Sequence, residues 1–246
     1  MKNPRKKVCL VAILFISGLQ IISGQILTDG GIRQNIERPD SELISELIMN
    51  RSFANTEKEN YPAIEGDPFL YRDFTPGRVF LKTGEKIPLY LRFNIFTHTI
   101  QFRYNEGIFA LLNQESVSFV LIDTLRFIYT SYLKSTGDDN SRANTWFLLK
   151  KDGKLKFLVM MNLKIQRGES ARAYQPPTNT RFVALPDSYY IGPEGKSAIR
   201  IESKNDVLSL LADKNAAVMQ FMKTNKLGVK KPKDLAKIVN YYNSLQ

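Results

Sequence analysis

The stretch that decides the fold is residues 146–165, which read WFLLKKDGKLKFLVMMNLKI. Two apolar strand patterns, Trp146 to Lys150 and Leu155 to Ile165, flank Lys151-Asp152-Gly153. An Asp-Gly pair supplies the positive φ angles that a tight type I′ turn requires. The stretch therefore predicts an antiparallel β-hairpin with a type I′ turn.

Strand patterns continue from this hairpin toward both ends of the chain. Val79-Phe80-Leu81 and the alternating run Ile87 to Ile95 flank Thr83-Gly84-Glu85, which predicts a second hairpin. Many short strands with local connections and no interleaved helices are typical of an antiparallel sheet that curls into a sandwich or an open barrel. The other predicted strands are Ile100 to Tyr104, Ile108 to Leu112, Val117 to Ile122, Leu125 to Tyr129, Phe182 to Leu185, Tyr189 to Ile191 and Ala198 to Ile201.

The apolar period changes at Ser203 to three and four residues, which predicts a group of three C-terminal helices. Ser203 and Asp206 resemble a capping box at the start of the first helix. Gly228 suits a C-terminal cap, and Pro232 suits the first turn of the last helix, where its missing N–H costs nothing. The apolar positions are Val207, Leu208, Leu211, Val218, Phe221, Met222, Leu235, Ile238, Val239 and Tyr242.

The predicted fold class is thus α+β, with an antiparallel β domain over residues 66–202 and a helical region over residues 203–246. An acidic lead-in over residues 25–65 precedes them and contains one amphipathic segment, which predicts a short helix at residues 41–50. The apolar face of this helix has to dock on its own domain or on a partner, and we expect its own domain. That face consists of Leu43, Ile44, Leu47 and Ile48.

Residues 1–24 have the features of a secretory signal peptide. An apolar run from Val8 to Phe15 follows the basic residues Lys2, Arg5, Lys6 and Lys7. The run is too short for a stable membrane span, and Gly24 is a small residue at a suitable cleavage point. We therefore expect export to the periplasm, the cell surface or beyond, with a mature chain that starts at Gln25 and has no transmembrane span.

Composition narrows the possible functions of the exported chain. Its only cysteine, Cys9, lies in the signal peptide, so thiol catalysis, disulfides and thiolate metal sites are excluded. Removal of the signal peptide leaves 31 basic and 24 acidic side chains, and residues 203–246 hold eight basic and three acidic ones. Outside the cytoplasm such a basic face favours anionic lipid or acidic glycan rather than nucleic acid. The alternative is a lysine-rich solvated surface.

Three short segments match known phosphate-binding, catalytic or metal-binding motifs only in part. Gly195-Lys196-Ser197 matches the end of a phosphate-binding loop, but Tyr190 stands where that loop needs its first glycine. His98 is the only histidine and has no catalytic or metal-binding motif beside it. Asp138-Asp139-Asn140 lacks the remaining ligands and the glycine of an EF-hand loop. The sequence therefore predicts no metal and no other cofactor.

Carboxylates and tyrosines supply two hypotheses about glycans. Two carboxylates that are distant in sequence can meet in a fold and hydrolyse a glycoside, and the residues for such a pair are Glu115, Asp123 and Glu169. Aromatic rings can stack on sugar rings, although core packing explains one member of each tyrosine pair. The tyrosines in question are Tyr189, Tyr190, Tyr241 and Tyr242.

Asp123-Thr124-Leu125 forms a short polar break between two strand patterns. The triplet resembles the acceptor pattern for protein O-glycosylation in the Bacteroidota, which pairs Asp with Ser or Thr and then an apolar residue. A plain strand connection explains the same residues. A glycan at Thr124 requires an exposed hydroxyl, because a sugar cannot fit into a close-packed core.

Several segments form a loose pattern over roughly residues 66–246. They are Gly66-Asp67-Pro68-Phe69-Leu70 with Phe74, Gly77 and Val79, then Leu91-Arg92-Phe93-Asn94-Ile95, Lys204 to Lys214, Asn225-Lys226-Leu227 and Tyr241-Tyr242-Asn243. Together these segments resemble a family of exported, uncharacterised proteins of the Bacteroidota. The resemblance implies a compartment and a lineage, but no activity, cofactor or site residue.

The leading functional hypothesis is an exported, non-catalytic cell-envelope protein that acts as an interaction or binding module. Its expected features are an exposed apolar or aromatic patch, on the 41–50 helix or on the C-terminal helices, and no enclosed polar pocket. Its partner is an envelope protein, anionic lipid or glycan. The alternative is a carrier of a lipid or another small apolar ligand inside the curled sheet, and a glycan-acting hydrolase is the third hypothesis. The residues expected to line a carrier cavity are Phe93, Phe102, Phe119 and Phe127.

Overall fold

A computed structural model of the chain describes residues 41–47, 61, 64–134, 141–171 and 176–245, all within one compact unit, Asn35–Gln246. The predicted signal peptide at residues 1–24 and the polar loop at residues 138–140 lie outside the described residues. None of the helices in the described ranges is both long enough and apolar enough to span a membrane.

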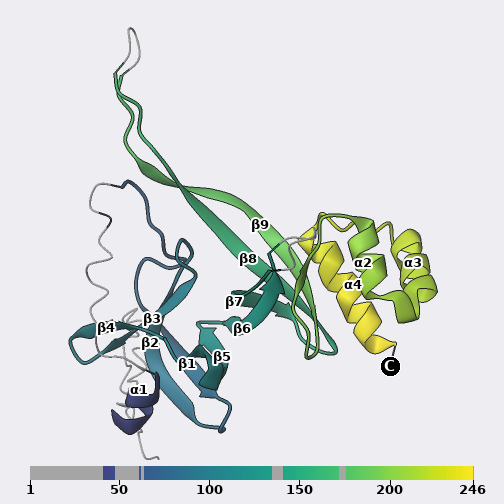
Figure 1. The fold of residues 1–246 in the computed structure, drawn as a ribbon, viewed down its shortest axis with the longest axis horizontal. Coiled ribbons are helices and arrows are strands. Elements are labelled where there is room, and N and C mark those ends of the chain that lie inside the picture. The colour runs from purple at the N-terminus through teal and green to yellow at the C-terminus, as the bar shows by residue number, and fades with distance from the viewer. Residues whose placement is uncertain (1–40, 48–60, 62–63, 135–140, 172–175, 246) are drawn as a thin grey trace, which may run out of the picture. The chain divides into compact units, whose positions relative to one another are not determined.

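Within the described residues, ten strands form one antiparallel sheet that is not closed, and three α-helices follow it, which confirms the predicted fold class (Figure 1). The order across the sheet is β10-β9-β8-β7-β6-β5-β1-β2-β3-β4. The strands are β1 (Thr75–Leu81), β2 (Lys86–Asn94), β3 (Thr99–Tyr104), β4 (Gly107–Ala110), β5 (Val117–Ile122), β6 (Leu125–Leu133), β7 (Arg142–Lys151), β8 (Leu155–Gln166), β9 (Arg181–Pro193) and β10 (Ile199–Arg200).

Both predicted hairpins are confirmed, because β1 pairs with β2 and β7 pairs with β8. The prediction of a type I′ turn between β7 and β8 is wrong. That turn needs positive φ at both central residues, but Gly153 has a φ of +137° and Asp152 is not in that region. The Asp152 carboxylate instead accepts a hydrogen bond from Gly153 N at 3.0 Å, and the β7–β8 ladder closes at Lys151 opposite Phe157. A wider connection replaces the tight turn.

The two strands expected over residues 182–191 are one continuous strand, β9. Pro186 lacks an N–H group and interrupts the ladder, which is why the sequence pattern breaks there. The register shifts at this position, and the Asn162 side chain bridges the irregularity by donating to Pro186 O at 2.8 Å and to Ser188 Oγ at 3.0 Å. These hydrogen bonds allow the long β8–β9 hairpin to continue past the proline.

The three predicted C-terminal helices are α2 (Lys204–Leu210), α3 (Asn215–Thr224) and α4 (Pro232–Ser244). The capping box of Ser203 and Asp206 is confirmed, as is Pro232 in the first turn of α4. The prediction that Gly228 is a C-terminal cap is wrong. Lys226 takes the left-handed position after α3 with a φ of +51°, while Gly228 N donates to the Asp234 carboxylate at 3.0 Å.

The predicted lead-in helix is confirmed over α1 (Ser41–Leu47), and residues 48–50 lie outside the described residues. Its side chains Ile44 and Leu47 are buried in the main hydrophobic core. The Leu47 carbonyl also accepts hydrogen bonds from Leu112 N at 3.3 Å and from Asn113 N at 3.4 Å. The apolar face of α1 therefore docks on its own domain, as expected.

The strands β7 and β8 are buried on both faces. One face adds Trp146 and Phe157 to the main core, to which α4 contributes Leu235, Ile238, Val239 and Tyr242. The opposite face adds Phe147 and Leu158 to a second, smaller cluster with Ile128, Met160, Tyr190 and Ala198. Backbone hydrogen bonds join Ala198 of the β10 end to Ser131 and Leu133 of β6. The last strands thus fold back beside β6 and cover the smaller cluster.

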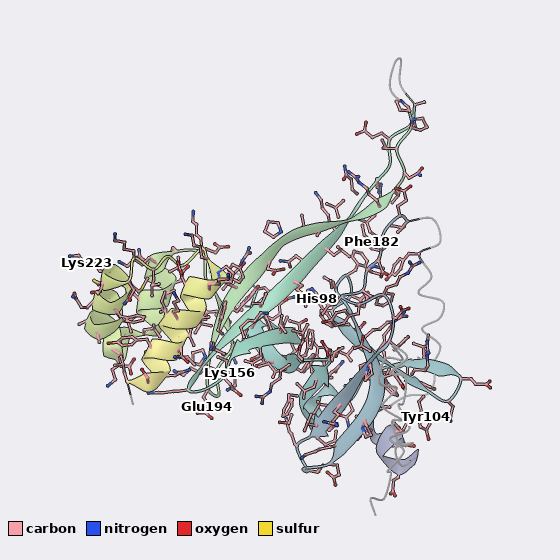
Figure 2. The ribbon with its side chains drawn as sticks, turned by 180° about the vertical axis from the view of Figure 1, so that it is seen from behind. His98, Tyr104, Lys156, Phe182, Glu194 and Lys223 are labelled. Atoms are coloured by element: carbon pink, nitrogen blue, oxygen red, sulfur yellow. The ribbon has the colours of Figure 1, made fainter. Side chains whose placement is uncertain are left out.

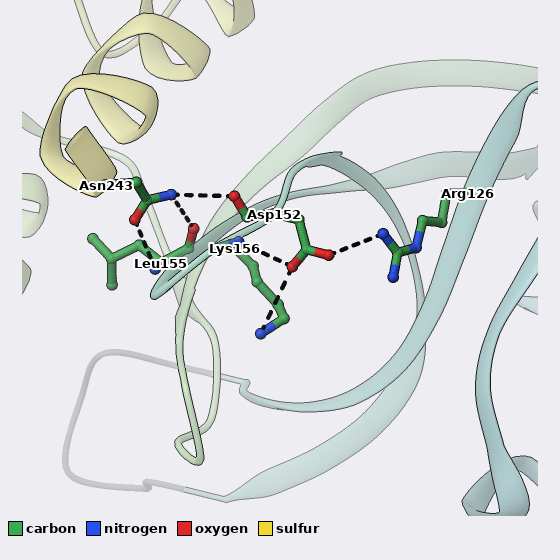
Figure 3. A network of polar contacts seen from close by, with 6 residues as sticks. Arg126, Asp152, Leu155, Lys156 and Asn243 are labelled. Carbon is green, nitrogen blue, oxygen red and sulfur yellow. Dashed lines mark hydrogen bonds and ion pairs between the residues drawn. The ribbon is translucent and has the colours of Figure 1, made fainter. Parts of the chain in front are cut away.

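Asn243 near the end of α4 connects the helical region to the β7–β8 connection (Figure 3). Its side chain accepts from Leu155 N at 3.0 Å and donates to Leu155 O at 2.9 Å and Asp152 O at 3.3 Å. A Cβ atom at Gly153 would lie only 2.5 Å from Asn243 Nδ2, so glycine is required at 153 for close approach as well as for its positive φ. We call this set of contacts the Asn243 clamp.

We predict that Asn243→Ala lowers the free energy of unfolding by about 1–3 kcal/mol, because it leaves the backbone groups of Leu155 without their partner. Asn240→Ala is the matched control, since Asn240 is an exposed residue of the same helix. Urea unfolding followed by circular dichroism measures both variants. Equal stability of the two variants would show that the clamp contributes nothing.

Candidate functional site

The four phenylalanines expected to line a carrier cavity do not share one environment. Phe93, Phe102 and Phe127 are buried in the main core, where the Phe93 and Phe127 rings lie 4.8 Å apart. Phe119 is half-buried beside the smaller cluster and stacks on Phe80 at 4.1 Å. An apolar ligand beside the first three rings would have to displace packed core side chains.

The tyrosines expected to stack on glycans make internal ring contacts. Tyr190 is 4% exposed and packs edge-on against Phe147 in the smaller cluster, so its faces are closed to a sugar. Tyr189 is tilted against Phe157, with 6.0 Å between ring centroids. Tyr241 is stacked on Phe221 at 4.0 Å, which covers one of its two faces. Tyr189 and Tyr241 thus belong to separate aromatic contacts.

The three carboxylates considered for glycoside hydrolysis lie in three different connections. Glu115 precedes β5 and Asp123 follows it, and the six residues of that strand span roughly 20 Å, well beyond the separation of a hydrolytic pair. Glu169 lies in the connection between β8 and β9. The described part of the chain also contains no group of three or more His, Cys, Asp or Glu side chains that could hold a metal ion.

A cavity of about 470 Å³ lies at the far end of the β8–β9 hairpin. Its lining is polar, and the lining residues are Glu65, Gln166, Arg167, Glu169, Thr178, Asn179 and Arg181. Asn179 Nδ2 donates to Glu65 Oε1 at 2.6 Å, and Arg181 Nη2 donates to Gln166 Oε1 at 3.3 Å. Because its polar groups hydrogen-bond one another and both signs of charge are present, this cavity does not resemble an apolar carrier site.

His98 is a structural residue that joins the β2–β3 loop to β8. Its Nε2 lies 3.0 Å from Met161 O, and its ring is parallel to that of Phe93. Phe182 of β9 packs edge-on against Phe96 and Tyr61 in the same part of the structure, where Figure 2 labels both His98 and Phe182. Partial burial lowers the pKa of His98, and the hydrogen bond with Met161 opposes this effect.

Some of the segments that resemble the Bacteroidota family also make contacts that stabilise the fold. The Arg92 guanidinium lies over the Phe69 ring at 3.6 Å and over the Phe74 ring at 4.4 Å. Leu70 N donates to Phe93 O at 2.9 Å, which holds the Phe69 segment beside β2. Together with the Asn243 clamp, these contacts account for several of the resembling residues through folding, without a ligand.

The helical region holds eight lysines and three aspartates, a clear excess of positive charge. All three of its carboxylates are used internally. Asp206 closes the capping box, Asp234 accepts from Gly228 N, and Asp213 accepts from Tyr242 Oη at 3.0 Å. Burial raises the pKa of the Asp206 carboxyl, but hydrogen bonds from Glu202 and Ser203 outweigh burial, so its pKa is lowered and it stays ionised.

The eight lysines of the helical region are all exposed, and none has an ion-pair partner within the part of the chain that the structure describes. Figure 2 shows Lys223 at the outer edge of the helical region, away from the strands. The other seven are Lys204, Lys214, Lys226, Lys230, Lys231, Lys233 and Lys237. We call these eight side chains the lysine surface. The lysine count and the Asp206 capping box were visible in the sequence, whereas the hydrogen bonds of Asp213 and Asp234 were not.

Thr124 satisfies the geometric requirement for a modification site. It lies with Asp123 in the two-residue connection between β5 and β6, where Ile122 pairs with Leu125. Its side chain is exposed, and Asp123 has a φ of +54° that directs the tight turn. The hydroxyl is within 3.4 Å of Asp123 Oδ2.

Comparison of the chain with protein-family models, with curated proteins and with solved structures gives no match. The geometry described above is therefore the basis for a functional proposal.

We predict that the stability of the protein falls as the pH is lowered through about 6.5, the ordinary pKa of histidine. Because burial holds the folded-state pKa of His98 below that value, the unfolded chain binds the proton first, and the loss levels off below the folded-state pKa. His98→Gln should lack this part of the pH dependence. Thermal unfolding over a pH series compares the two proteins, and identical profiles would contradict the assignment.

We predict a glycan on Thr124 when the protein is produced in its native host, because the side chain is exposed in a tight turn. Intact-mass measurement should find an added mass that disappears in Thr124→Ala. Thr130→Ala serves as a control that lies within strand β6. Wild-type protein with the unmodified mass would refute the prediction.

Proposed function

We propose that this protein is an exported, non-catalytic interaction module of the cell envelope, and that it binds an anionic partner through the lysine surface of its helical region. The signal-peptide pattern of residues 1–24 supports export. The absence of a thiol from residues 25–246 fits a protein that depends on ordinary core packing outside the cytoplasm.

One observation carries this proposal. The helical region has an excess of lysine, and each of its three aspartates is occupied by a hydrogen bond that stabilises the fold. Lys154 of the sheet approaches Asp213 at 3.9 Å, so even the most exposed of these carboxylates already faces a sheet lysine. The lysine surface therefore keeps its positive potential in the folded protein and attracts anions.

The fold supports the helical region as a fixed platform for this surface. Helix α4 packs against β7 and β8, α3 packs on α4, and α2 packs on α3. Leu235, Ile238 and Val239 are fully buried in the main core, and the Asn243 clamp adds a polar connection. The lysines of α3 and α4 are thus presented by helices whose other faces are buried against the protein.

The proposal predicts that neutralising lysines of the helical region weakens binding to a model polyanion. Lys230→Gln, Lys233→Gln and Lys237→Gln are combined in one variant, which should elute from immobilised heparin at lower salt than the wild type. The matched control combines Lys82→Gln, Lys151→Gln and Lys164→Gln, which are exposed positions of the β region. Both variants have the same net charge, so only the position of the lost charges differs.

A larger loss of heparin retention in the first variant supports the proposal. If both variants elute at the same salt concentration, the lysine surface is only a solvated exterior and the proposal is wrong. Thermal unfolding of each variant verifies that the substitutions leave the fold intact.

A further inference from the structure

The turn between α3 and α4 holds a lysine in an unfavourable backbone conformation. Leu227 N donates to Met222 O at 2.9 Å, and Lys226 N donates to Lys223 O at 3.2 Å. This pair of bonds ends α3 and requires a left-handed residue at 226, where the φ is +51°. Glycine adopts this conformation without a steric penalty, whereas lysine does not.

Leu227 fixes the position of this turn. Its side chain is half-buried and packs against the main core, while Lys226 beside it is exposed. Gly228 is only two residues further along, yet the left-handed position is occupied by lysine. The turn therefore holds the charge of Lys226 at an exposed position, at a cost to the backbone conformation.

Positive charge is concentrated around the same turn. Residues 223–233 contain five lysines and no carboxylate, and we call this segment the basic turn. Its lysines are Lys223, Lys226, Lys230, Lys231 and Lys233, all of them exposed. The nearest carboxylate, Asp234, accepts from Gly228 N and lies in the first turn of α4. The 13-residue helix α4 also directs the positive end of its dipole toward the basic turn.

The chemistry of these side chains favours binding to a surface that carries many negative charges over binding of a single anion. The helical region has no arginine, the residue that recognises one phosphate or carboxylate through paired hydrogen bonds. Lysine instead acts as a flexible point charge, and clusters of lysine are attracted to anionic lipid surfaces. The described polar cavity has a separate lining, which includes none of the lysines of the basic turn.

We propose that the basic turn is the contact site for an anionic phospholipid surface, with Lys226 held in place to meet the headgroup phosphates. This inference rests on the proposed function and specifies its partner. The contact is electrostatic, because the side chains that make it are exposed lysines, and added salt should therefore weaken it.

The test compares two glycine substitutions at left-handed positions. Lys226→Gly alters the basic turn, and Asn105→Gly alters the β3–β4 turn, where the φ is also +51°. Lys226→Gly should raise the melting temperature, because glycine relieves the backbone conflict, whereas asparagine already tolerates the left-handed conformation and Asn105→Gly should change it little. Binding is measured by co-sedimentation with vesicles of equal parts phosphatidylcholine and phosphatidylglycerol, and with pure phosphatidylcholine vesicles as the neutral comparison.

We expect Lys226→Gly to bind the anionic vesicles about fivefold more weakly than the wild type, the effect of one lysine near such a surface. Asn105→Gly should bind like the wild type, and none of the three proteins should bind the neutral vesicles. Unchanged vesicle binding by Lys226→Gly would overturn the inference. A loss of binding together with a lowered melting temperature would also overturn it, because damage to the fold would then be the cause.

Heparin retention of the same wild-type protein separates this inference from the proposed function. Wild-type protein that is retained on heparin but does not bind anionic vesicles contradicts the lipid partner and leaves an acidic glycan as the partner. Wild-type protein that binds neither contradicts the proposed function itself. Release from vesicles by low concentrations of inorganic phosphate would show a site for free phosphate and would overturn the membrane contact.

Discussion

The hairpin of β7 and β8 has apolar side chains on both faces, and both faces have to be covered. A strand in an antiparallel sheet normally has one solvated face, with polar residues at alternate positions. Here Trp146 and Phe157 require cover on one side, and Phe147 and Leu158 require it on the other. Helix α4 shares the main core with the first pair, while the return of the β10 end to β6 covers the second cluster. The positions of the helical region and of the last strands follow from this requirement.

The same requirement fixes the distribution of charge. Because the apolar side of α4 packs on the sheet, Lys233 and Lys237 of α4 remain on its exposed side, as does Lys223 on that of α3. The carboxylates that would have balanced them are engaged in a capping box, in a turn and in a bond to Tyr242. Burial, followed by the hydrogen bond from Tyr242 to Asp213, raises the pKa of the Tyr242 hydroxyl, so this contact stays a neutral donor to a carboxylate. In the folded chain the excess of lysine thus lies on the exposed sides of the helical region, and within the described residues none of these lysines forms an ion pair.

The β8–β9 hairpin shows how a ribbon that extends beyond its neighbouring strands is stabilised. The pairing of β8 with β7 ends at Val159, and a two-stranded ribbon alone is marginally stable in water. His98 supports the β8 side through Met161, and Glu65 supports the β9 side through backbone bonds with Thr180 and Phe182. Both supports come from segments far away in the sequence. The single histidine therefore has a structural explanation that its sequence neighbours did not provide.

The sequence by itself determined the local structure of this protein. Alternation of apolar residues predicted the strands and both hairpins, and the change of period at Ser203 predicted the three helices, because these patterns depend only on near neighbours. Contacts between distant segments were decided by the tertiary structure alone. Asn243 of α4 contacts the β7–β8 connection, and the environments of Phe119 and Tyr190 depend on which sheet face each one joins. The basic character of the helical region was visible as a lysine count, and the role of Asp206 was visible as a capping-box pattern. Only the folded chain showed the hydrogen bond between Tyr242 and Asp213, because it joins residues that the sequence keeps apart.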